Sequence, residues 1–154
     1  MEQVQLLSRN LRRVKQLYNR ILLRELAAHN LDQHFEALLA LSEQDKPVTQ
    51  NMLAELLQMD KSRIVSIVYD LGKRNLIIIK TNPADRREHY ITLSAKGKGA
   101  IPVIENTIAK VNELANTGIS EEKLLAFFEA SAAMHQNLAK YAEPEALALN
   151  AKAS

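Results

Sequence analysis

Residues 49–97 decide the fold of this chain, and they read TQNMLAELLQMDKSRIVSIVYDLGKRNLIIIKTNPADRREHYITLSAKG. From about Asp60 to Asn75, apolar residues stand at positions 64, 67, 68 and 71. These spacings form one stripe of a helix, so that side is expected to pack inward. The opposite side offers hydrogen-bond donors or positive charge, on Lys61, Ser62, Arg63, Ser66, Tyr69 and Lys73. Such a face suits a helix in a DNA major groove.

A shorter helix is predicted just before this one, over residues 50–57, with Thr49 as its N-cap. Its inward side should be apolar, formed by Leu53, Leu56 and Leu57. Val48 either begins a short strand or belongs to a turn. Residues 58–60 form a tight turn, and either Asp60 or Ser62 caps the longer helix. Two helices joined in this way indicate a helix-turn-helix.

A β-hairpin is predicted after the longer helix. Its strands are Leu76–Lys80 and His89–Leu93, and the polar turn Thr81–Glu88 joins them. Arg86 and Arg87 stand next to each other in this turn, so the tip of the hairpin is cationic. A helix-turn-helix followed by such a hairpin is a winged helix, and its basic surface predicts a DNA-binding regulator.

The composition excludes several classes of protein. The chain has 154 residues, 47% of them hydrophobic, which suits one domain with a long helical extension. Because it has no cysteine, it holds no disulfide and no cysteine-based zinc site. We find no signal peptide and no apolar run long enough to span a membrane, so we expect a soluble, cytoplasmic protein.

Charge is distributed unevenly along the chain, although its total is only +2. Residues 60–100 hold nine basic and four acidic side chains, a net of +5, whereas residues 101–154 carry a net of −3. A basic middle is an electrostatic footprint for a polyanion such as nucleic acid. An ordinary solvated basic surface would give the same pattern.

Long helices are predicted before the winged helix. The first runs to about His29 and carries an apolar stripe of Val4, Leu7, Leu11, Val14, Tyr18 and Ile21. This stripe could be core, or half of a helix–helix dimer contact, and we favour both together. Asp32 is the expected N-cap of the next helix. That helix carries Phe35, Leu38, Leu39 and Leu41 and ends near Ser42.

Two further helices are predicted after the hairpin. Pro102 belongs in a first helical turn, so the fifth helix should begin near Gly99 or kink at the proline. It should end at residues 116–118, with Gly118 as the residue after the helix. Ser120 should cap the last helix, and Pro144 should mark its end. Apolar faces are expected on both helices, from Ile101, Ile104, Ile108, Val111 and Ala115 and from Leu124, Phe127, Phe128, Met134, Leu138 and Tyr141.

The hairpin resembles the wing of the MarR family of bacterial regulators, whose signature is Asp-x-Arg, then Leu-Thr, then Gly. The matching residues here are Asp85-Arg86-Arg87, Leu93-Ser94 and Gly97, preceded by Asn82-Pro83-Ala84. Upstream, residues 48–50, 53–54, 60–62 and 71 fall in the family's helix-turn-helix register, and the resemblance covers about residues 5–142.

The chain departs from the family pattern at three positions. Ser94 replaces the usual Thr and keeps its hydroxyl group. Asn75 stands where Gly is usual, and it tolerates the left-handed backbone that the turn needs. Arg63 stands where small hydroxyl residues are common, which bears on the DNA sequence preferred.

The resemblance implies a mainly α (α+β) fold: a winged helix-turn-helix with long N- and C-terminal dimerisation helices. Residues 1–154 would form one MarR-like domain, with a DNA-binding lobe over 32–98, a dimerisation region over 1–29 and 99–143, and a tail over 144–154. It implies an obligate homodimer that binds double-stranded DNA. The operator should be pseudo-palindromic, with half-sites about ten base pairs apart, and repression is the expected outcome.

DNA contacts are expected from two groups of residues. Ser62, Arg63 and Ser66 are candidates for base contacts, although Arg63 could equally bind phosphate alone. Phosphate contacts are expected from Thr49, Gln50, Lys61, Lys73 and Lys80. By analogy Arg86 enters the minor groove, whereas Arg87 pairs with Asp85 and braces the hairpin. Tyr69 completes the predicted DNA-facing set.

Relatives in the family often bind a small aromatic acid between the dimer helices and the DNA-binding lobe. Here such a crevice would be lined by Tyr18, Leu22, Phe35, Leu38 and Ile104, although these residues would equally serve as filled core. No cofactor or metal site is expected. His29, His34 and nearby Glu36 could suggest a metal sensor, but they show no ligand spacing.

An enzyme would need signals that this chain does not show. It has no nucleophile elbow, no phosphate-binding glycine loop and no metal triad, so we expect no enzyme. The remaining alternative is a winged helix used only for protein–protein contact, which salt-dependent DNA binding would exclude.

Overall fold

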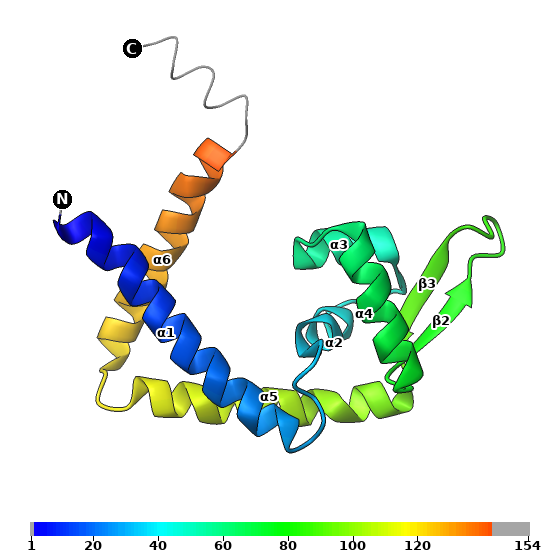
Figure 1. The fold of residues 1–154 in the computed structure, drawn as a ribbon, viewed down its shortest axis with the longest axis horizontal. Coiled ribbons are helices and arrows are strands. Elements are labelled where there is room, and N and C mark those ends of the chain that lie inside the picture. The colour runs from blue at the N-terminus through cyan, green and yellow to red at the C-terminus, as the bar shows by residue number, and fades with distance from the viewer. Residues whose placement is uncertain (1, 143–154) are drawn as a thin grey trace, which may run out of the picture. The chain divides into compact units, whose positions relative to one another are not determined.

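The computed structural model describes residues 2–142, with side chains from residue 7 onward. Its elements are α1 (Glu2–Ala27), α2 (Phe35–Ser42), β1 (Val48–Thr49), α3 (Gln50–Leu57), α4 (Lys61–Lys73), β2 (Ile77–Thr81), β3 (His89–Leu93), α5 (Ala95–Asn116) and α6 (Glu121–Ala142) (Figure 1). The chain divides into two compact units, residues 1–113 and 114–154. Among the described residues, no helix is both long and apolar enough to cross a membrane.

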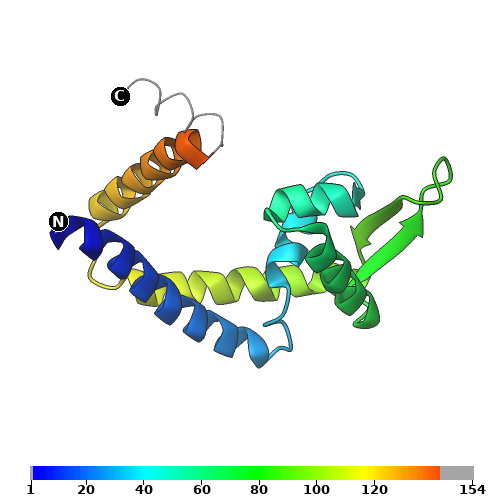
Figure 2. The same cartoon turned by 45° about the horizontal axis from the view of Figure 1, so that its top comes forward.

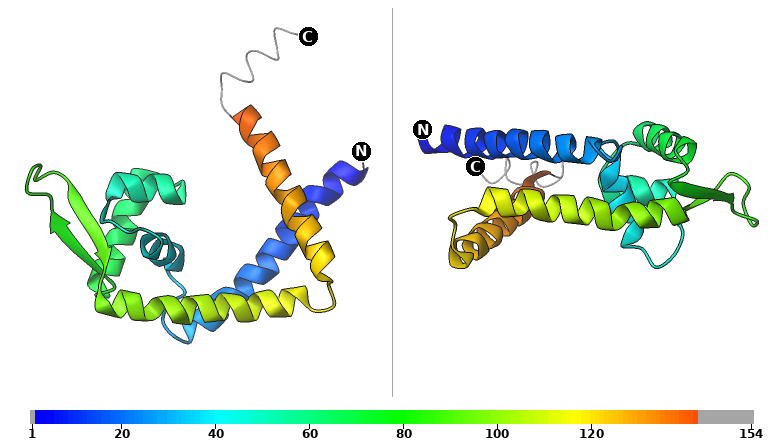
Figure 3. Two further views of the ribbon diagram at one scale, coloured as in Figure 1. Left: turned by 180° about the vertical axis from the view of Figure 1, so that it is seen from behind. Right: turned by 90° about the horizontal axis from the view of Figure 1, so that it is seen from below.

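The first unit contains the predicted winged helix. Strand β3 lies between β1 and β2 in an antiparallel sheet, and Ile91 pairs with Val48 on one side and Ile79 on the other. Val48 therefore begins a strand, which decides between the two sequence-based alternatives. The hairpin β2–β3 and its loop, residues 82–88, form the wing, which extends beyond the helices beside it (Figures 2 and 3).

The apolar stripe of α4 is buried as predicted, because Ile64, Ile67, Val68 and Leu71 are each at most 4% exposed. They join a core that contains Leu38, Leu53, Ile91 and Ile104. Burying an aliphatic side chain of this size contributes about 1.5–3 kcal/mol, so the stripe holds α4 firmly on the lobe.

Leu56 is a prediction that the structure contradicts, because its side chain is 46% exposed. In α3 the inward side consists of Leu53 and Ala54, with Leu57 partly buried. On a helix of 3.6 residues per turn these three positions span about 100°, and Leu56 lies about 60° outside that arc. Alanine at position 54 thus takes the buried place that was expected for leucine.

The caps of the helix-turn-helix form as predicted. The Thr49 hydroxyl accepts a hydrogen bond from the Met52 backbone N–H at 3.2 Å and caps α3. Asp60 Oδ1 accepts from the Arg63 N–H at 2.9 Å, so Asp60 rather than Ser62 caps α4. After α4, Asn75 has a φ of 57°. Asparagine therefore fills the left-handed position where the family usually has glycine.

Asp32 does not cap α2. Helix α1 ends at Ala27, two residues earlier than expected, and the Leu31 N–H closes that end on the Leu26 carbonyl at 3.0 Å. Leu31 is buried, and Asp32 stands in the loop that connects α1 to α2. His34 takes the N-cap position with a φ of 64° and makes no side-chain cap.

Helix α5 begins at Ala95, earlier than the expected start near Gly99, and Pro102 lies inside it. Ser94 caps this start, because its hydroxyl accepts from the Gly97 N–H at 3.0 Å and its carbonyl from the Lys98 N–H at 2.9 Å. The lost hydrogen bond and the ring clash at a mid-helix proline cost about 3 kcal/mol, which the burial of Ala100 and Ile104 offsets.

The end of α5 and the start of α6 match the predictions. Gly118 has a φ of 77° after the end of α5. The Ser120 hydroxyl accepts from the Lys123 N–H at 3.4 Å at the start of α6. Pro144 and the tail lie outside the described residues.

Apolar side chains on the terminal helices are only partly buried in a single chain. The second half of α1 packs in the first unit, because Leu22 and Leu26 are buried and Lys110 Nζ lies 2.8 Å from Glu25 Oε2. Toward the N-terminus, Leu7, Leu11 and Val14 are 47–63% exposed, and Val4 lies outside the described side chains. Helix α6 has no buried residue. Its most exposed apolar side chains are Leu125, Phe127, Phe128, Leu138 and Tyr141.

Candidate nucleic-acid interface

The outward face of α4 carries every polar residue predicted for it. All six side chains are exposed, namely Lys61, Ser62, Arg63, Ser66, Tyr69 and Lys73. Lys73 Nζ lies 5.5 Å from the centre of the Tyr69 ring, a cation–π contact that positions both groups near the end of the helix. The face is therefore open to a partner, with cations at both ends and hydroxyl groups between them.

The start of α4 is held by a small polar network around Asp60. The Ser62 hydroxyl donates to Asp60 Oδ1 at 2.6 Å, and the Arg63 N–H donates to the same oxygen. These two bonds, that of Ser62 first, hold the pKa of Asp60 below its usual value. Because the Ser62 hydroxyl donates its proton to Asp60, it can only accept a hydrogen bond from a DNA partner.

This network predicts a specific acid sensitivity. A carboxylate whose pKa is lower in the folded state adds stability above its unfolded pKa of about 3.9, and loses it as the pH falls through the folded value. Asp60→Ala should therefore lower the free energy of unfolding at pH 7, and the difference from wild type should shrink below about pH 4. Urea unfolding at both pH values measures it, and an unchanged difference would contradict the role of Asp60.

The wing loop is closed by backbone hydrogen bonds. The Arg87 N–H donates to Asp85 Oδ1 at 2.9 Å, and the Glu88 N–H donates to the Asp85 carbonyl at 3.0 Å. The expected pairing of Asp85 with the Arg87 guanidinium is not among the ion pairs of the described residues. Asp85 thus braces the loop through the backbone of residue 87, because a short side chain reaches a nearby N–H more easily than a distant guanidinium.

A hollow of about 270 Å³ lies where the start of α3 meets the wing. Thr49, Gln50, Asp85 and Arg87 line it, so the structure brings together residues predicted from separate segments. Thr49 is only 8% exposed and its oxygen serves the α3 cap, which suits it less to a phosphate contact than Gln50.

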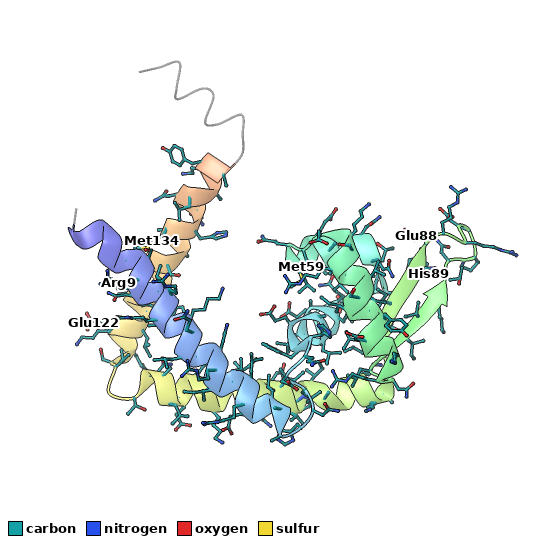
Figure 4. All side chains as sticks on the ribbon, in the orientation of Figure 1. Arg9, Met59, Glu88, His89, Glu122 and Met134 are labelled. Atoms are coloured by element: carbon teal, nitrogen blue, oxygen red, sulfur yellow. The ribbon has the colours of Figure 1, made fainter. Side chains whose placement is uncertain are left out.

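The same hollow includes Asn51, Glu88 and His89, which the sequence did not single out. Asn51 stands in the first turn of α3, and His89 begins β3. Glu88 and His89 lie at the wing end of the hairpin (Figure 4). Their place next to Thr49 and Gln50 depends on β1 pairing with β3, a contact between distant parts of the sequence. Lys80 is exposed on β2.

A cleft of about 350 Å³ lies between α1, α2 and α4. Of the five residues predicted for a ligand crevice, Leu22 and Phe35 line it. Leu38 and Ile104 are fully buried in the core instead, and the Tyr18 hydroxyl donates to Asn112 Oδ1 at 2.7 Å. Within α2, Leu38 thus packs in the core, whereas Phe35 lines the cleft.

The cleft is also lined by residues for which the sequence predicts a different role or none. Met59, in the turn before α4, lines it (Figure 4). Arg63 and Ser66 line it as well, although both were predicted as base contacts. The two side chains therefore border the cleft and the exposed face of α4 at the same time.

The loop beside the cleft is tied to the far end of α4. His34 Nε2 lies 3.2 Å from Asp70 Oδ2. The Arg74 guanidinium donates to the carbonyl oxygens of Asn30 and Gln33. Within the described residues, no group of three or more histidine, cysteine, aspartate or glutamate side chains is arranged to hold a metal ion.

Two sequence comparisons relate this chain to known proteins. A sequence model of the MarR family matches residues 31–88. A protein of Thauera aromatica, provisionally named as the transcriptional regulatory protein for the hcr operon, is 30% identical over 66 residues. That match covers 43% of this chain and only 40% of the relative's length.

Solved structures extend the likeness to the terminal helices. A MarR family regulator of Listeria monocytogenes, solved with a 26mer DNA, has a TM-score of 0.72 at 20% identity and covers 92% of each chain. Bordetella bronchiseptica BpsR, whose DNA binding is regulated by 6-hydroxynicotinic acid, has a TM-score of 0.74 at 20% identity. It covers 84% of this chain and 98% of its own.

At such identities the solved structures establish the shared fold. They bear out the mainly α winged helix-turn-helix architecture predicted from residues 49–97. The sequence match over residues 31–88 covers part of the loop before α2, the whole helix-turn-helix, strand β2 and the whole wing loop. Over this lobe the sequence is similar to the MarR family, and over most of its length the chain has the winged helix-turn-helix fold of the solved Listeria protein.

Proposed function

We propose that this protein binds double-stranded DNA in a sequence-specific manner and represses transcription, with release by a small ligand. The observation that carries the proposal is the exposed face of α4. Arg63 and Ser66 stand between Lys61 and Lys73 on a helix whose opposite side is buried in the core. A helix held in this way can enter a major groove without rearrangement of the lobe.

Each group on this surface has a distinct task. Arg63 would donate two hydrogen bonds to a guanine, a contact worth about 1–3 kcal/mol of discrimination between bases. Lys61, Lys73 and Lys80 would bind phosphates and set the position of the lobe. Arg86 would enter the minor groove, which is narrow and strongly negative over A·T tracts. The Listeria relative solved with DNA supports such a use of the fold.

We propose a homodimer formed by residues 1–29 and 99–143. The apolar side chains that a single chain leaves exposed on α1 and α6 support it, because a monomeric protein rarely exposes so many large apolar groups on its helices. Two lobes related by a twofold axis would fit a pseudo-palindromic operator with half-sites about ten base pairs apart. Such a regulator acts on the chromosome, so we expect it in the cytoplasm.

The cleft between α1, α2 and α4 is the proposed effector site. Leu22, Phe35 and Ile67 offer an apolar wall, and Arg63 offers a cation to the acid group of a small aromatic acid. BpsR, the relative regulated by 6-hydroxynicotinic acid, supports this class of effector. A ligand that engages Arg63 and Ser66 would withdraw from DNA the same two side chains that we assign to base contacts.

Genomic fragment selection followed by salt titration tests the proposal. The selected duplex should bind one dimer, with a slope of log K against log salt steeper than about −5, because several phosphates are neutralised per dimer. A flat response would favour a protein partner and overturn the DNA-binding function.

A thermal-shift screen of phenolic acids tests the proposed effector. At least one phenolic acid should stabilise the protein and weaken its complex with DNA. If none has an effect, the proposal of an effector site is wrong.

A further inference from the structure

We propose that Asn82 is a positioning residue of the wing, which engages the carboxylate of Glu88 and so keeps Arg86 and Arg87 available to DNA. This inference rests on the proposed DNA-binding function and assigns a role to Asn82, an uncharged residue that the sequence marks only as part of the resemblance. Asn82 stands at the first residue after β2, and Glu88 at the last residue before β3. The two close the wing loop from opposite sides.

Four hydrogen bonds meet at Asn82. Its backbone N–H donates to the Glu88 carbonyl at 2.8 Å. Its side-chain Nδ2 donates to Glu88 Oε2 at 2.7 Å and to the Tyr90 hydroxyl at 3.1 Å, and its Oδ1 accepts from the Ala84 N–H at 2.9 Å. One amide thus joins both strands of the hairpin to the loop between them.

The chemistry of the partners determines which way the amide faces. A backbone N–H can only donate, so Oδ1 must point toward Ala84. An ionised carboxylate can only accept, so Nδ2 must point toward Glu88. No other uncharged side chain of this size offers an acceptor and two donors in one plane, and aspartate would place two carboxylates against each other.

The charges of the wing loop explain why these hydrogen bonds matter for DNA binding. Asp85 and Glu88 formally cancel Arg86 and Arg87, so the loop has no net charge. Both acids nevertheless accept hydrogen bonds inside the loop, Asp85 from the Arg87 N–H and Glu88 from Asn82. In the part of the chain that the structure describes, neither arginine takes part in an ion pair. A formally neutral loop therefore offers its partner two uncommitted cations.

Loss of Asn82 would release the Glu88 carboxylate next to two arginines in a short loop. An arginine that pairs with this carboxylate must break the pair before it can reach the minor groove, and the loop also loses the hydrogen bonds of the Asn82 side chain to Tyr90 and Ala84. DNA affinity should fall for both reasons, most strongly for duplexes with A·T tracts under the wings.

A double-mutant cycle on Asn82 and Glu88 tests the inference. Asn82→Asp should weaken binding of an A·T-flanked operator by about tenfold, because both wings of the dimer lose a contact. Glu88→Gln alone should change binding little, since its amide oxygen still accepts from Asn82. The double variant N82D/E88Q reverses donor and acceptor at unchanged net charge, and it should bind within about threefold of wild type.

Ala84→Asp is the matched control, because it adds the same charge to the same exposed loop without removing a hydrogen bond of Asn82. Glu88→Gln should cause the same small change in the A84D variant as in wild type, whereas it should rescue the N82D variant. Equal effects of Glu88→Gln in all three backgrounds would overturn the inference and leave DNA binding intact. A wild-type protein that binds no selected duplex would instead overturn the proposed function.

Asn82→Ala keeps the test decisive if N82D fails to fold. It removes the amide without adding a charge, and it should reduce the preference for A·T over G·C flanks while the melting temperature changes by only a few degrees. An unchanged flank preference would contradict the role of Asn82, because a purely structural residue would alter stability and not this preference.

Discussion

Gly97→Ala is expected to destabilise the protein by about 3 kcal/mol or more, which corresponds to a fall of about 10 °C in melting temperature. A Cβ at this position would lie 2.0 Å from the Leu76 carbonyl oxygen and 3.1 Å from its carbon. Leu76 cannot move aside easily, because its side chain is 2% exposed and its carbonyl accepts from the Ser94 N–H at 3.1 Å.

The clash lies where the start of α5 contacts the turn between α4 and β2. The Ser94 hydroxyl donates to the Asn75 carbonyl at 2.6 Å, and Lys96 Nζ donates to the Arg74 carbonyl at 2.8 Å. The start of α5 can approach this turn so closely only because residue 97 has no side chain. A larger residue would separate α5 from the lobe and shift the wing that follows α4.

Gly99→Ala, two residues later in the same helix, provides the control. A Cβ there meets nothing within 4 Å, so alanine should stabilise the helix by as much as about 1 kcal/mol. Thermal and urea unfolding of the two variants should therefore move in opposite directions. Equal effects would mean that close packing on Leu76 does not explain the glycine of the wing signature.

Replacing both wing arginines, Arg86→Ala and Arg87→Ala together, should weaken operator binding about 100-fold at moderate salt. A dimer loses four cations, and about 0.7 kcal/mol for each gives nearly 3 kcal/mol, or about two factors of ten. The salt dependence should become shallower as well, because fewer counterions are released on binding. Fluorescence anisotropy with an A·T-flanked operator at several salt concentrations measures both quantities.

The adjacent pair Arg12 and Arg13 on α1 provides a matched control. Both side chains are exposed on α1 and lie outside the predicted DNA-binding lobe, 32–98, but within the proposed dimerisation region, so the dimeric state of this variant is measured first. R12A/R13A removes the same charge from the chain as the wing variant, so it should change affinity less than about threefold if position matters more than net charge. An equal loss in the two double variants would contradict a specific role for the wing.

Much of the DNA-binding lobe could be predicted from local patterns. The stripe on α4, the caps Thr49 and Asp60, and the left-handed Asn75 each depend on residues within a few positions of one another. Helical periodicity and capping are short-range effects, so their sequence signals survive in the folded chain. The exposed polar face of α4 followed from the same periodicity.

Errors occurred where a choice between nearby partners, or a contact with a distant segment, decides the local outcome. Leu56 is exposed because Ala54 faces the core, and α5 begins at Ala95 because the lobe holds its first turn in place. The resemblance predicts the Arg87 guanidinium as the partner of Asp85, yet the turn geometry gives Asp85 the backbone N–H of residue 87. None of these choices is visible in spacing along the chain.

The sequence by itself determined the helix-turn-helix, the hairpin with its two arginines and the apolar stripes of the terminal helices, because each follows from local periodicity and turn chemistry. Only the tertiary structure decided that Leu38 and Ile104 are core, and that Arg63 and Ser66 border a cleft. It also revealed the hydrogen bond between Asn82 and Glu88, which needs β2 and β3 in register. Apolar or polar character predicts whether a residue faces inward or outward, whereas the residues that it contacts depend on how distant segments pack.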